Sequence, residues 1–560
     1  MRTAGFRTPP RLLPAALAGC ALVGAALAAA GGRPREDAAA EAPARQGPER
    51  PVRGGTAVIG SNADISGVNE LVVPATLPTD EVLFRIFQHL VEEQGDFDER
   101  PPTFEPQLAE AWEFSPDRKT LTFRLRRGAV WSDGVPITAE DVRWTWQAQT
   151  HPDVGWTDAS AKERITDVQV LDPHTVRFHF REAYGKQLLD ANEGVILPKH
   201  AWSALPFAEW PKSADWFREH LVTSGPFLLA SWKPQQELVL ARNPRYYDPR
   251  LPYLDRVVLR VVPEQSALLT MLRNGEVDFL SGNVSPADVP AVRADPDLQL
   301  IAYWFKLTVF VAWNNEDPRF ADREVRRALT MAIDRQTIVD SLWGELARVG
   351  SSPILANIWA HHPRLRPLPY DPQEARRILA ARGWRDTNGD GLLDRGGQPF
   401  AFELTTNTGN QQRADATVMI QEQLRRVGIQ AEPRVLEFHT LVEQLDDGTF
   451  DAMVTGIGLD TSLDFTSFLH SRSVGDGNNF PRYRNPEMDL LLEEIQRAPD
   501  ILQARGKLHR LQEIVARDQP VSFLWESQRI HGANRRLRDV QSNILFSLFD
   551  LEEWWMAPAR

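Results

Sequence analysis

The chain has 560 residues, more than one hydrophobic core usually supports, so two or three folded lobes are expected. Its 42% hydrophobic and 25% charged residues are typical of a soluble globular protein. The net charge of -13 argues against a nucleic-acid partner, which needs a basic face, and the single cysteine, Cys20, excludes an intrachain disulfide and a CxxC metal site.

The first thirty residues have the pattern of an export signal, because three arginines precede an apolar run over residues 12–30. Within this run, Leu17 to Cys20 (LAGC) resembles the lipobox of bacterial lipoproteins, in which the signal is cut before the cysteine and the thiol carries a diacylglycerol. We therefore assign residues 1–20 to the signal. Cys20 is expected to anchor the protein by a lipid in the periplasm or at the outer face of the cytoplasmic membrane.

Two alternatives to lipidation stay open, because the apolar run continues past the cysteine. Cleavage after Ala30 would release a soluble protein, and the run is also just long enough to remain as an uncleaved anchor helix. Residues 31–53 contain almost no bulky apolar side chain and cannot bury a core. A flexible linker is therefore expected over residues 21–51.

The folded part begins with a buried strand at residues 56–60, followed by a polar loop that starts at Ser61. Residues 120–126 and 175–180 alternate apolar and polar side chains, which indicates half-buried strands. Between them, Thr138 is expected to start a helix, capped by the acidic residue three positions later. Strands with helices on one side predict an α+β lobe.

Strands return after Gly225, at residues 237–241 and 257–262, and the second of these is apolar on both faces, so a central position in a sheet is expected. A helix then follows, with Asp322 as its N-cap and Gly344 at its end. Its apolar residues recur at the spacing of one helix face: Val325, Ala328, Leu329, Ala332 and Ile333.

Residues 400–435 have the pattern strand, helix, strand, with Gly428 ending the helix. Such a βαβ unit requires a parallel sheet. Two amphipathic helices follow at residues 488–495 and 508–515. The segment 309–525 is therefore predicted to be a separate α/β lobe.

Several landmarks in one order are similar to those of the family 5 extracellular solute-binding proteins, which include the oligopeptide, dipeptide and nickel receptors of bacterial ABC importers. The resemblance covers nearly all of residues 54–555. Its landmarks are GGTAVIG (54–60), PQLAEAWEFSPDRKTLTFRLRRGAVWSDGVPITAEDV (106–142), TSGPFLLASW (223–232), ARNPRYYDPRLPYLDRVVLRVVPE (241–264), RNGEVDFL (273–280) and REVRRALTMAIDRQTIV (323–339).

The resemblance implies an α/β fold with two lobes, of the periplasmic-binding-protein type II, cluster C. Domain I would be discontinuous, formed by residues 52–82, 222–308 and 526–560, with residues 83–221 as an added strand-rich subdomain. Domain II would be residues 309–525. Such a protein closes about a hinge, and ligand favours the closed state because only there do both lobes touch it.

The resemblance also implies a function without catalysis: capture of a peptide or peptide-like solute and its delivery to ABC permease subunits in the membrane. No cofactor is required, and a monomer is expected. A ligand sensor without transport and a hydrolase on the same fold are the alternatives. The chain has no GxSxG, HExxH, GxxxxGK or GxGxxG motif, although catalytic groups can also assemble from distant positions.

In the peptide receptors of this family, a carboxylate after a strand holds the N-terminal ammonium of the ligand, and Asp460 stands at the matching position. The match is not complete, because Ile457 replaces the usual tryptophan and Phe465 the usual proline. A ligand other than an ordinary peptide is therefore an open interpretation. The alternative role for Asp460, and equally for Asp464, is to cap the next helix.

Other candidate ligand-binding residues follow from the same resemblance. Backbone groups in two segments would pair with an extended ligand, as in strand addition, and an aromatic residue with its neighbour would line the pocket wall. For the aromatic residue, Trp313, an ordinary core position is the alternative. The candidates are Ser61, Asn62, Ala63, Gly456, Gly458, Leu459, Trp313 and Asn314.

One loop supplies oxygens at alternate positions with glycine at its sixth position, like the opening of an EF-hand calcium loop. Position 12, however, is Gly397 rather than glutamate, so an Asx-rich turn without an ion is the alternative. His361 and His362 are adjacent in a proline-rich loop, where a solvated turn is expected rather than a metal site. The ligands of the calcium would be Asp386, Asn388, Asp390, Leu392 and Asp394.

Overall fold

The structure is a computed structural model that describes residues 50–475 and 477–558. The signal at residues 1–20, the lipidation residue Cys20 and nearly all of the linker at residues 21–51 lie outside these described residues. The chain from Pro51 onward forms one compact unit. Within the described ranges, no helix is both long enough and apolar enough to cross a membrane.

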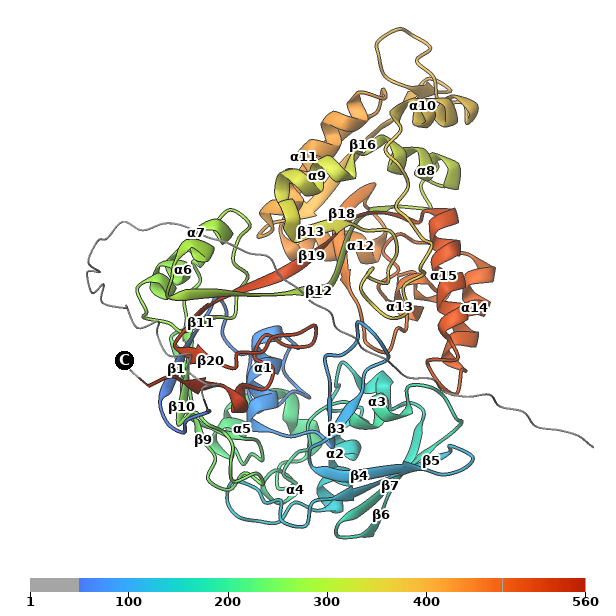
Figure 1. The fold of residues 1–560 in the computed structure, drawn as a ribbon. Helices are drawn as coiled ribbons and strands as arrows, with labels where there is room; N and C mark the ends of the chain where they lie inside the picture. Colours follow the sequence, from blue (N-terminus) through green and yellow to red (C-terminus); the bar gives the residue numbers. More distant parts are fainter. Residues whose placement is uncertain (1–49, 476, 559–560) are drawn as a thin grey trace, which may run out of the picture. The chain divides into compact units, whose positions relative to one another are not determined.

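A mixed sheet of eleven strands extends through the protein (Figure 1). Ten strands form a continuous path, and the remaining strand, β13 (Ala347–Val349), pairs with β19. In spatial order the path is β17 (Gln430–Leu436), β16 (Ala401–Asn407), β18 (Ala452–Gly458), β12 (Leu298–Trp313), β19 (Val521–Asn534), β11 (Phe279–Leu280), β1 (Thr56–Ser61), β10 (Arg256–Val261), β9 (Glu237–Arg242) and β8 (Phe227–Lys233).

The long strands β12 and β19 join the two halves of this sheet. They pair antiparallel from Leu298 opposite Asn534 to Ala312 opposite Val521, side by side in Figure 1. The predicted lobe boundaries at 308/309 and 525/526 fall inside these strands, so the chain passes between the halves twice without a loop. The domain boundaries themselves stay a prediction.

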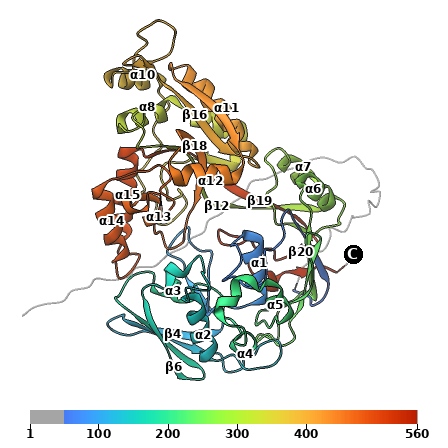
Figure 2. The ribbon, with the colours of Figure 1, turned by 180° about the vertical axis from the view of Figure 1, so that it is seen from behind.

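The strands near the N-terminus form where the sequence patterns predicted them. β1 pairs in parallel with β10, and β10 in turn pairs with β9, so the segment that is apolar on both faces is central in the sheet as predicted. Along β10, Val257, Leu259 and Val261 on one face are buried, whereas on the other face Arg256 is exposed and Val258 is half-buried. The helices of this half include α6 (Gln265–Arg273) and α7 (Val289–Ala294), which contact β19 and β12 respectively and lie beside them in the reverse view of Figure 2.

Residues 83–221 contain a separate antiparallel sheet of four strands. Thr138 caps the helix packed on it, and its backbone N–H donates a 2.8 Å hydrogen bond to the Asp141 carboxylate, as the sequence predicts. The sheet order is β4 (Ala109–Phe114), β5 (Thr120–Leu125), β7 (Thr175–Phe180), β6 (Ile165–Asp172), and the helices are α2 (Ala139–Gln149), α3 (Gln187–Asn192), α4 (Lys199–Trp202) and α5 (Ala214–Glu219).

The other half confirms the predicted βαβ unit. β16 and β17 are parallel, the helix between them is α11 (Gln411–Arg425), and Gly428, with φ of +84°, allows the turn into the second strand. The two amphipathic helices are also present, as α14 (Pro486–Gln496) and α15 (Arg505–Asp518). Three more helices complete this half: α10 (Pro372–Ala381), α12 (Phe438–Asp447) and α13 (Thr466–Leu469).

One predicted helix is wrong in extent. The helix expected from Asp322 to Gly344 is two helices, α8 (Arg323–Ala332) and α9 (Arg335–Leu342). Asp334 separates them, because its side chain accepts a 3.0 Å hydrogen bond from the Thr337 backbone N–H and so starts a new helix. Its own N–H donates to the Gln423 side chain at 2.7 Å, a contact that no local pattern in the sequence reveals.

The buried side chains of this half form two cores, one on each face of the sheet. Along β12, Val309 and Val311 belong to one core, whereas Phe310 and Ala312 belong to the other. This alternation follows from the two-residue period of a strand. The two faces of this part of the sheet are therefore occupied by core packing, and the loops at the strand ends are left to form a site.

Candidate ligand-binding cleft

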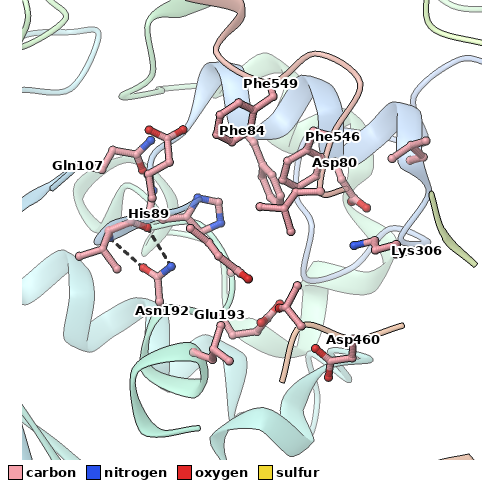
Figure 3. Close-up of a pocket in the computed structure, with 18 of the residues that line it drawn as sticks. Asp80, Phe84, His89, Gln107, Asn192, Glu193, Lys306, Asp460, Phe546 and Phe549 are labelled. Carbon is pink, nitrogen blue, oxygen red and sulfur yellow. Dashed lines mark hydrogen bonds between the residues drawn. The ribbon is translucent and has the colours of Figure 1, made fainter. Parts of the chain in front are cut away.

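A cavity of about 530 Å³ lies beside the crossing strands, and segments from both halves line it. Figure 3 shows the rings of Phe84, Phe546 and Phe549 on one side of it and the carboxylates of Glu193 and Asp460 on the opposite side. The residues come from six or more separate chain segments. The cavity therefore exists only because of the tertiary fold.

Helix α1 (Leu77–Ile86) supplies one wall. Asp80 and Phe84 are four residues apart, so they share one helix face, and this face lines the cavity. On another face, the buried Glu81 carboxylate accepts 2.7 Å hydrogen bonds from the backbone N–H groups of Ser547 and Leu548. The helix thus fixes the position of the C-terminal segment.

The C-terminal segment adds aromatic side chains to the same wall. Arg85, which is 4% exposed, forms a 2.8 Å ion pair with Glu552 and holds this segment against α1. The ring of Phe546 meets that of Phe84 edge-on, with 5.0 Å between centroids. Since Arg85 is already paired with Glu552, its charge is largely neutralised before a ligand arrives.

A second wall comes from the hairpin of β2 (Val91–Glu93) and β3 (Phe104–Pro106) and from the end of α3. The Asn192 side chain accepts a 2.9 Å hydrogen bond from the Val91 N–H and donates a 2.9 Å bond to its carbonyl, as dashed lines in Figure 3 show. This pairing fixes the next residue, Glu193, beside Glu93, and both side chains line the cavity.

The third wall lies where β12 changes register with β19, between Trp304 and Thr308. Lys306 lies within this irregular stretch, and its side chain reaches toward Asp80 in the cavity (Figure 3). The Lys306 carbonyl accepts a 2.7 Å hydrogen bond from the backbone N–H of Leu459, which extends β18 and places Asp460 at the cavity. A bulge beside a site that re-aims a side chain is a frequent feature of sheets.

A second cavity of about 630 Å³ continues from the first, and the two share Glu93, Glu193 and Asp460. Two polar contacts cross it between residues 83–221 and 309–525. Lys186 forms a 3.4 Å ion pair with Asp464, and Arg164 donates to the Gln496 carbonyl at 3.2 Å and to its side chain at 3.0 Å. The two cavities together form the cleft, the name used below.

The carboxyl groups of the cleft are held in an environment that disfavours their charge. Burial raises the pKa of Asp80 to about 6 and that of Glu93 to about 7. Burial also raises the pKa of Glu193, and the charge of Asp460 adds to this effect. His89 is neutral, because burial lowers its pKa to about 3.

The structure brings Asp460 to the centre of the cleft, but not the loop after β1. Ser61 is 3% exposed, and its hydroxyl donates a 2.7 Å hydrogen bond to the carbonyl of Ala63. Asn62 and Ala63 are exposed, and none of the three lines either cavity. The loop is a tight turn that satisfies its own polar groups.

In β18, Gly456 is partly exposed and Gly458 fully so, whereas the Leu459 side chain is buried in the core. A side chain could not replace the hydrogen at Gly456, because a Cβ there would lie 2.9 Å from the Thr308 carbonyl oxygen and 2.9 Å from Nη2 of Arg413. This strand end adjoins the cleft through Asp460.

The prediction that Trp313 and Asn314 line the pocket wall is wrong. Trp313 is 0% exposed, and its indole N–H donates a 2.9 Å hydrogen bond to the hydroxyl of Ser522 on the neighbouring strand. Asn314 is also buried, and its side-chain amide donates to the carbonyls of Gly448 and Phe450. Both residues stabilise the core at the far end of β12, and the core alternative for Trp313 is confirmed.

The loop predicted to bind calcium forms a network of Asx turns. The Asp386 carboxylate accepts hydrogen bonds from the N–H groups of Gly389 and Gly391, at 2.7 and 3.0 Å. The Asp394 carboxylate accepts hydrogen bonds from the Thr387 hydroxyl at 2.7 Å and from the Thr387 N–H at 2.9 Å, and these two bonds lower the pKa of Asp394. The remaining predicted ligands take part in similar turns. The Asn388 side-chain oxygen accepts a hydrogen bond from the Asp390 N–H, and the Asp390 carboxylate accepts one from the Leu392 N–H.

Calcium at this loop stays a prediction, since the carboxylates use their oxygens within the turn. Among the described residues, the group of carboxylates close enough to share an ion is Glu92, Asp550 and Glu552, and Arg85 already supplies a cation there. The expected solvated turn at His361 and His362 is wrong for His362, which is 8% exposed and packs edge-on against His509.

Sequence patterns missed most of the cleft. Asp80, Glu93, Glu193, Lys306 and Phe546 lie in five segments that are far apart in the chain, and no motif links them. A usable signal was the pair of consecutive glutamates at the end of a short strand, because charged residues at strand ends commonly belong to binding loops. The convergence of the segments follows from the sheet order, which the sequence does not reveal.

Residues 103–479 match the family described as bacterial extracellular solute-binding proteins, family 5 middle. The chain is 30% identical over 524 residues to the oligopeptide-binding protein AppA of Bacillus subtilis (strain 168), covering 92% of this chain and 94% of that protein. It is 27% identical over 443 residues to the periplasmic oligopeptide-binding protein OppA of Salmonella typhimurium, covering 72% and 75% of the two chains.

Solved structures show the same fold. The oligopeptide-binding protein AppA from Bacillus subtilis, in complex with a nonapeptide, superposes with a TM-score of 0.76 at 29% identity, covering 91% of this chain and 100% of that one. NikZ from Campylobacter jejuni, in complex with Ni(L-His), superposes with the same TM-score of 0.76 at 21% identity, covering 89% and 99%. The α/β solute-receptor fold expected from the sequence is therefore confirmed.

Proposed function

We propose, since this chain belongs to family 5 of the bacterial extracellular solute-binding proteins, that it captures a peptide or peptide-like solute for the permease of an ABC importer. The observation that carries the proposal is the cleft, in which Asp460 of the segment 309–525 lies beside Glu193 of residues 83–221 and across from Asp80. A solute held there touches both halves, so binding and closure are linked.

The peptide backbone is assigned to the free edge of β18. This strand pairs with β12 along its length, but with β16 only at Ala452 and Met453. Toward Gly456 and Gly458 one edge therefore has backbone groups without a strand partner, as strand addition by an extended peptide requires. Recognition through the backbone accepts many sequences, which suits a nutrient receptor.

The N-terminal ammonium of the peptide is assigned to Asp460. The Asp460 carboxylate is held in place by the Ser462 backbone N–H at 2.9 Å and the Ser462 hydroxyl at 2.6 Å, so it needs no reorganisation to accept the ligand. A charge-assisted hydrogen bond is stronger than a neutral one. No chemical step follows, because the family binds solutes and does not transform them.

The protein acts outside the cytoplasm, as the family does. A lipid on Cys20 would keep it near the permease, and the LAGC segment supports this assignment. Metabolic labelling with a palmitate analogue tests it: the wild type is expected to carry the label and the Cys20→Ser variant to lose it. Label on the variant, or none on the wild type, contradicts the anchor.

The proposed ligand class is tested by native mass spectrometry of the purified protein, followed by calorimetric titration with synthetic peptides. Retained mass that fragments into amino acids, together with saturable 1:1 binding of a peptide, is the expected result. A retained solute without peptide bonds, combined with no binding across a diverse peptide set, contradicts the assignment.

A further inference from the structure

We infer that the solute carries a second positive charge besides its N-terminal ammonium, as in a peptide with a lysine or arginine side chain, and that Glu93 and Glu193 bind this charge. The inference rests on the proposed function and narrows its substrate class. Its basis is a cleft in which carboxylates outnumber available cations, next to a wall of aromatic rings.

The carboxylates of the cleft lack basic partners. Asp80, Glu93, Glu193 and Asp460 all line the first cavity, and no ion pair joins any of them to a basic side chain within residues 50–475 and 477–558. Two acidic side chains that meet on one face of a cavity repel each other, unless a cation is placed between them. Protons relieve part of this repulsion in the empty cleft, because burial raises the pKa of Asp80 and Glu93, and a cationic solute would take the place of those protons.

The basic side chains that line the first cavity are fewer than its carboxylates. Arg85 is paired with Glu552 at 2.8 Å, and the Arg529 guanidinium lies over the Phe305 ring, 4.3 Å from its centroid. Lys162, below Glu193, donates to two backbone carbonyls, at 2.6 and 2.7 Å. Lys306 and Arg529 both line the first cavity and form no ion pair within residues 50–475 and 477–558, and two cations cannot neutralise four carboxylates.

An independent observation points to Glu93 as a residue that binds the solute. Its Oε1 atom is buried and has no hydrogen-bond partner among the described residues. Buried carboxylate oxygens are almost always hydrogen-bonded or paired with a cation, because leaving them alone costs free energy. Burial raises the pKa of Glu93 to about 7; a hydrogen bond with the Thr461 side chain lowers it, and the nearby Asp460 and Glu193 raise it. A donor from the solute would satisfy this atom.

The wall of aromatic rings opposite Glu193 favours one kind of cation. Phe84, Phe546 and Phe549 face Glu193 across the cavity in Figure 3. A lysine or arginine side chain combines an apolar stem, which packs on such rings, with a charged end that reaches the carboxylates. A bare metal ion would use only the carboxylates, and an anionic chelate would be repelled by them.

The test uses pentapeptides of alanine in which each position in turn is replaced by lysine, norleucine or glutamate. Norleucine keeps the stem of lysine without its ammonium, so the pair isolates the charge. At one position the lysine peptide is expected to bind the full-length protein about tenfold more tightly than the norleucine peptide, with glutamate weakest, as one desolvated charge pair predicts.

The same titrations are repeated with the variants Glu93→Gln and Glu193→Gln and with the control Glu105→Gln. Glu105 is exposed and lies outside both cavities. It stands opposite Glu92 in the strand register of the β2–β3 hairpin. The two cleft variants are expected to lose the preference for lysine over norleucine. The control keeps the preference.

Equal binding of lysine and norleucine peptides at every position overturns the inference and leaves the peptide receptor standing. Failure of all the peptides to bind overturns the proposed function, and the inference with it. The comparison of lysine and norleucine peptides uses the wild-type protein, so it tests the inference even if a cleft variant does not fold. Tight binding of a divalent cation in place of lysine peptides would also overturn the inference.

Discussion

Asp460 and Asp464 lie four residues apart and have different roles. Asp460 lines both cavities, and its carboxylate bonds only to Ser462, two residues away. Asp464 accepts a 2.9 Å hydrogen bond from the Thr466 N–H at the start of α13 and pairs with Lys186, and these bonds, with the charge of the lysine, lower its pKa despite burial. The helix-capping interpretation therefore suits Asp464, and the ligand interpretation suits Asp460.

The Asp460→Ala variant is expected to bind peptide at least about tenfold more weakly, because a hydrogen bond to a charged group contributes about 1.5–3 kcal/mol. The Tm of the ligand-free protein should stay within about 1 °C of the wild type, since no distant contact is lost. Calorimetry and thermal unfolding measure the two effects. Asp464→Ala is the matched control, with a lower Tm; unchanged peptide affinity in Asp460→Ala would remove that residue from the site.

The raised pKa values of Asp80 and Glu93 predict how stability depends on pH. The folded protein keeps protons on these groups that the unfolded chain releases above its ordinary carboxyl pKa, so their contribution to stability is present at low pH and is lost as pH rises through about 6 to 7. The charged groups that act on the two are Glu81, Asp158, Glu193, Lys306 and Asp460.

The Tm of the ligand-free protein should therefore fall between about pH 5 and pH 8, and Glu93→Gln should make this slope shallower. A cationic solute favours the ionised carboxylates, so its binding should release protons and tighten over the same range. Thermal unfolding in a pH series measures the first effect, and calorimetry in buffers of different ionisation enthalpy measures the second. A Tm that rises across this range would contradict the assignment of buried, protonated carboxyls.

At the scale of elements, α1 and the C-terminal segment form one wall of the cleft. Arg85→Ala leaves Glu552 buried without its partner, and breaking such a pair typically costs about 3–5 kcal/mol. The variant is expected to lose stability by about that amount in urea unfolding and to bind peptide more weakly, since Phe546 loses its support. Arg250→Ala, which breaks the pair of an exposed arginine with Asp248, should change stability little; similar losses in both variants would contradict this role.

Local patterns in the sequence predicted many of the elements that surround this wall. The alternation at β5 and β7, the cap at Thr138 and the stop at Gly428 all act within a few residues, so they can be recognised in the sequence. The division of the predicted helix at Asp334 could not be recognised in the same way, because it depends partly on a contact with Gln423, a residue far along the chain.

The site was less predictable than the fold, for a physical reason. Asp460 follows a strand and could be matched to a pattern, but Trp313 has the same sequence context whether its strand end faces a cavity or a core. The sheet order decides between these outcomes, and it places Trp313 against Ser522. Glu193 and Lys306 become neighbours of Asp460 only after β12 and β18 have paired.

At the scale of the whole molecule, β12 and β19 are the natural hinge, because they connect the two halves without an intervening loop. Lys186 contacts Asp464 and Arg164 contacts Gln496 across the cleft, and these contacts are expected to favour closure. The solute adds to these contacts from both sides. Closure is then a shift in a population that exists already, and the solute stabilises it by its greater affinity for that state.

Small-angle X-ray scattering of the purified protein, with and without a saturating peptide, tests this account most directly. The account predicts a smaller radius of gyration and a shorter maximum dimension with peptide, and partial reversal of both in Asp460→Ala at the same peptide concentration. Identical scattering profiles in a sample whose peptide occupancy is confirmed by calorimetry would show a rigid molecule, and would contradict capture by closure of the cleft.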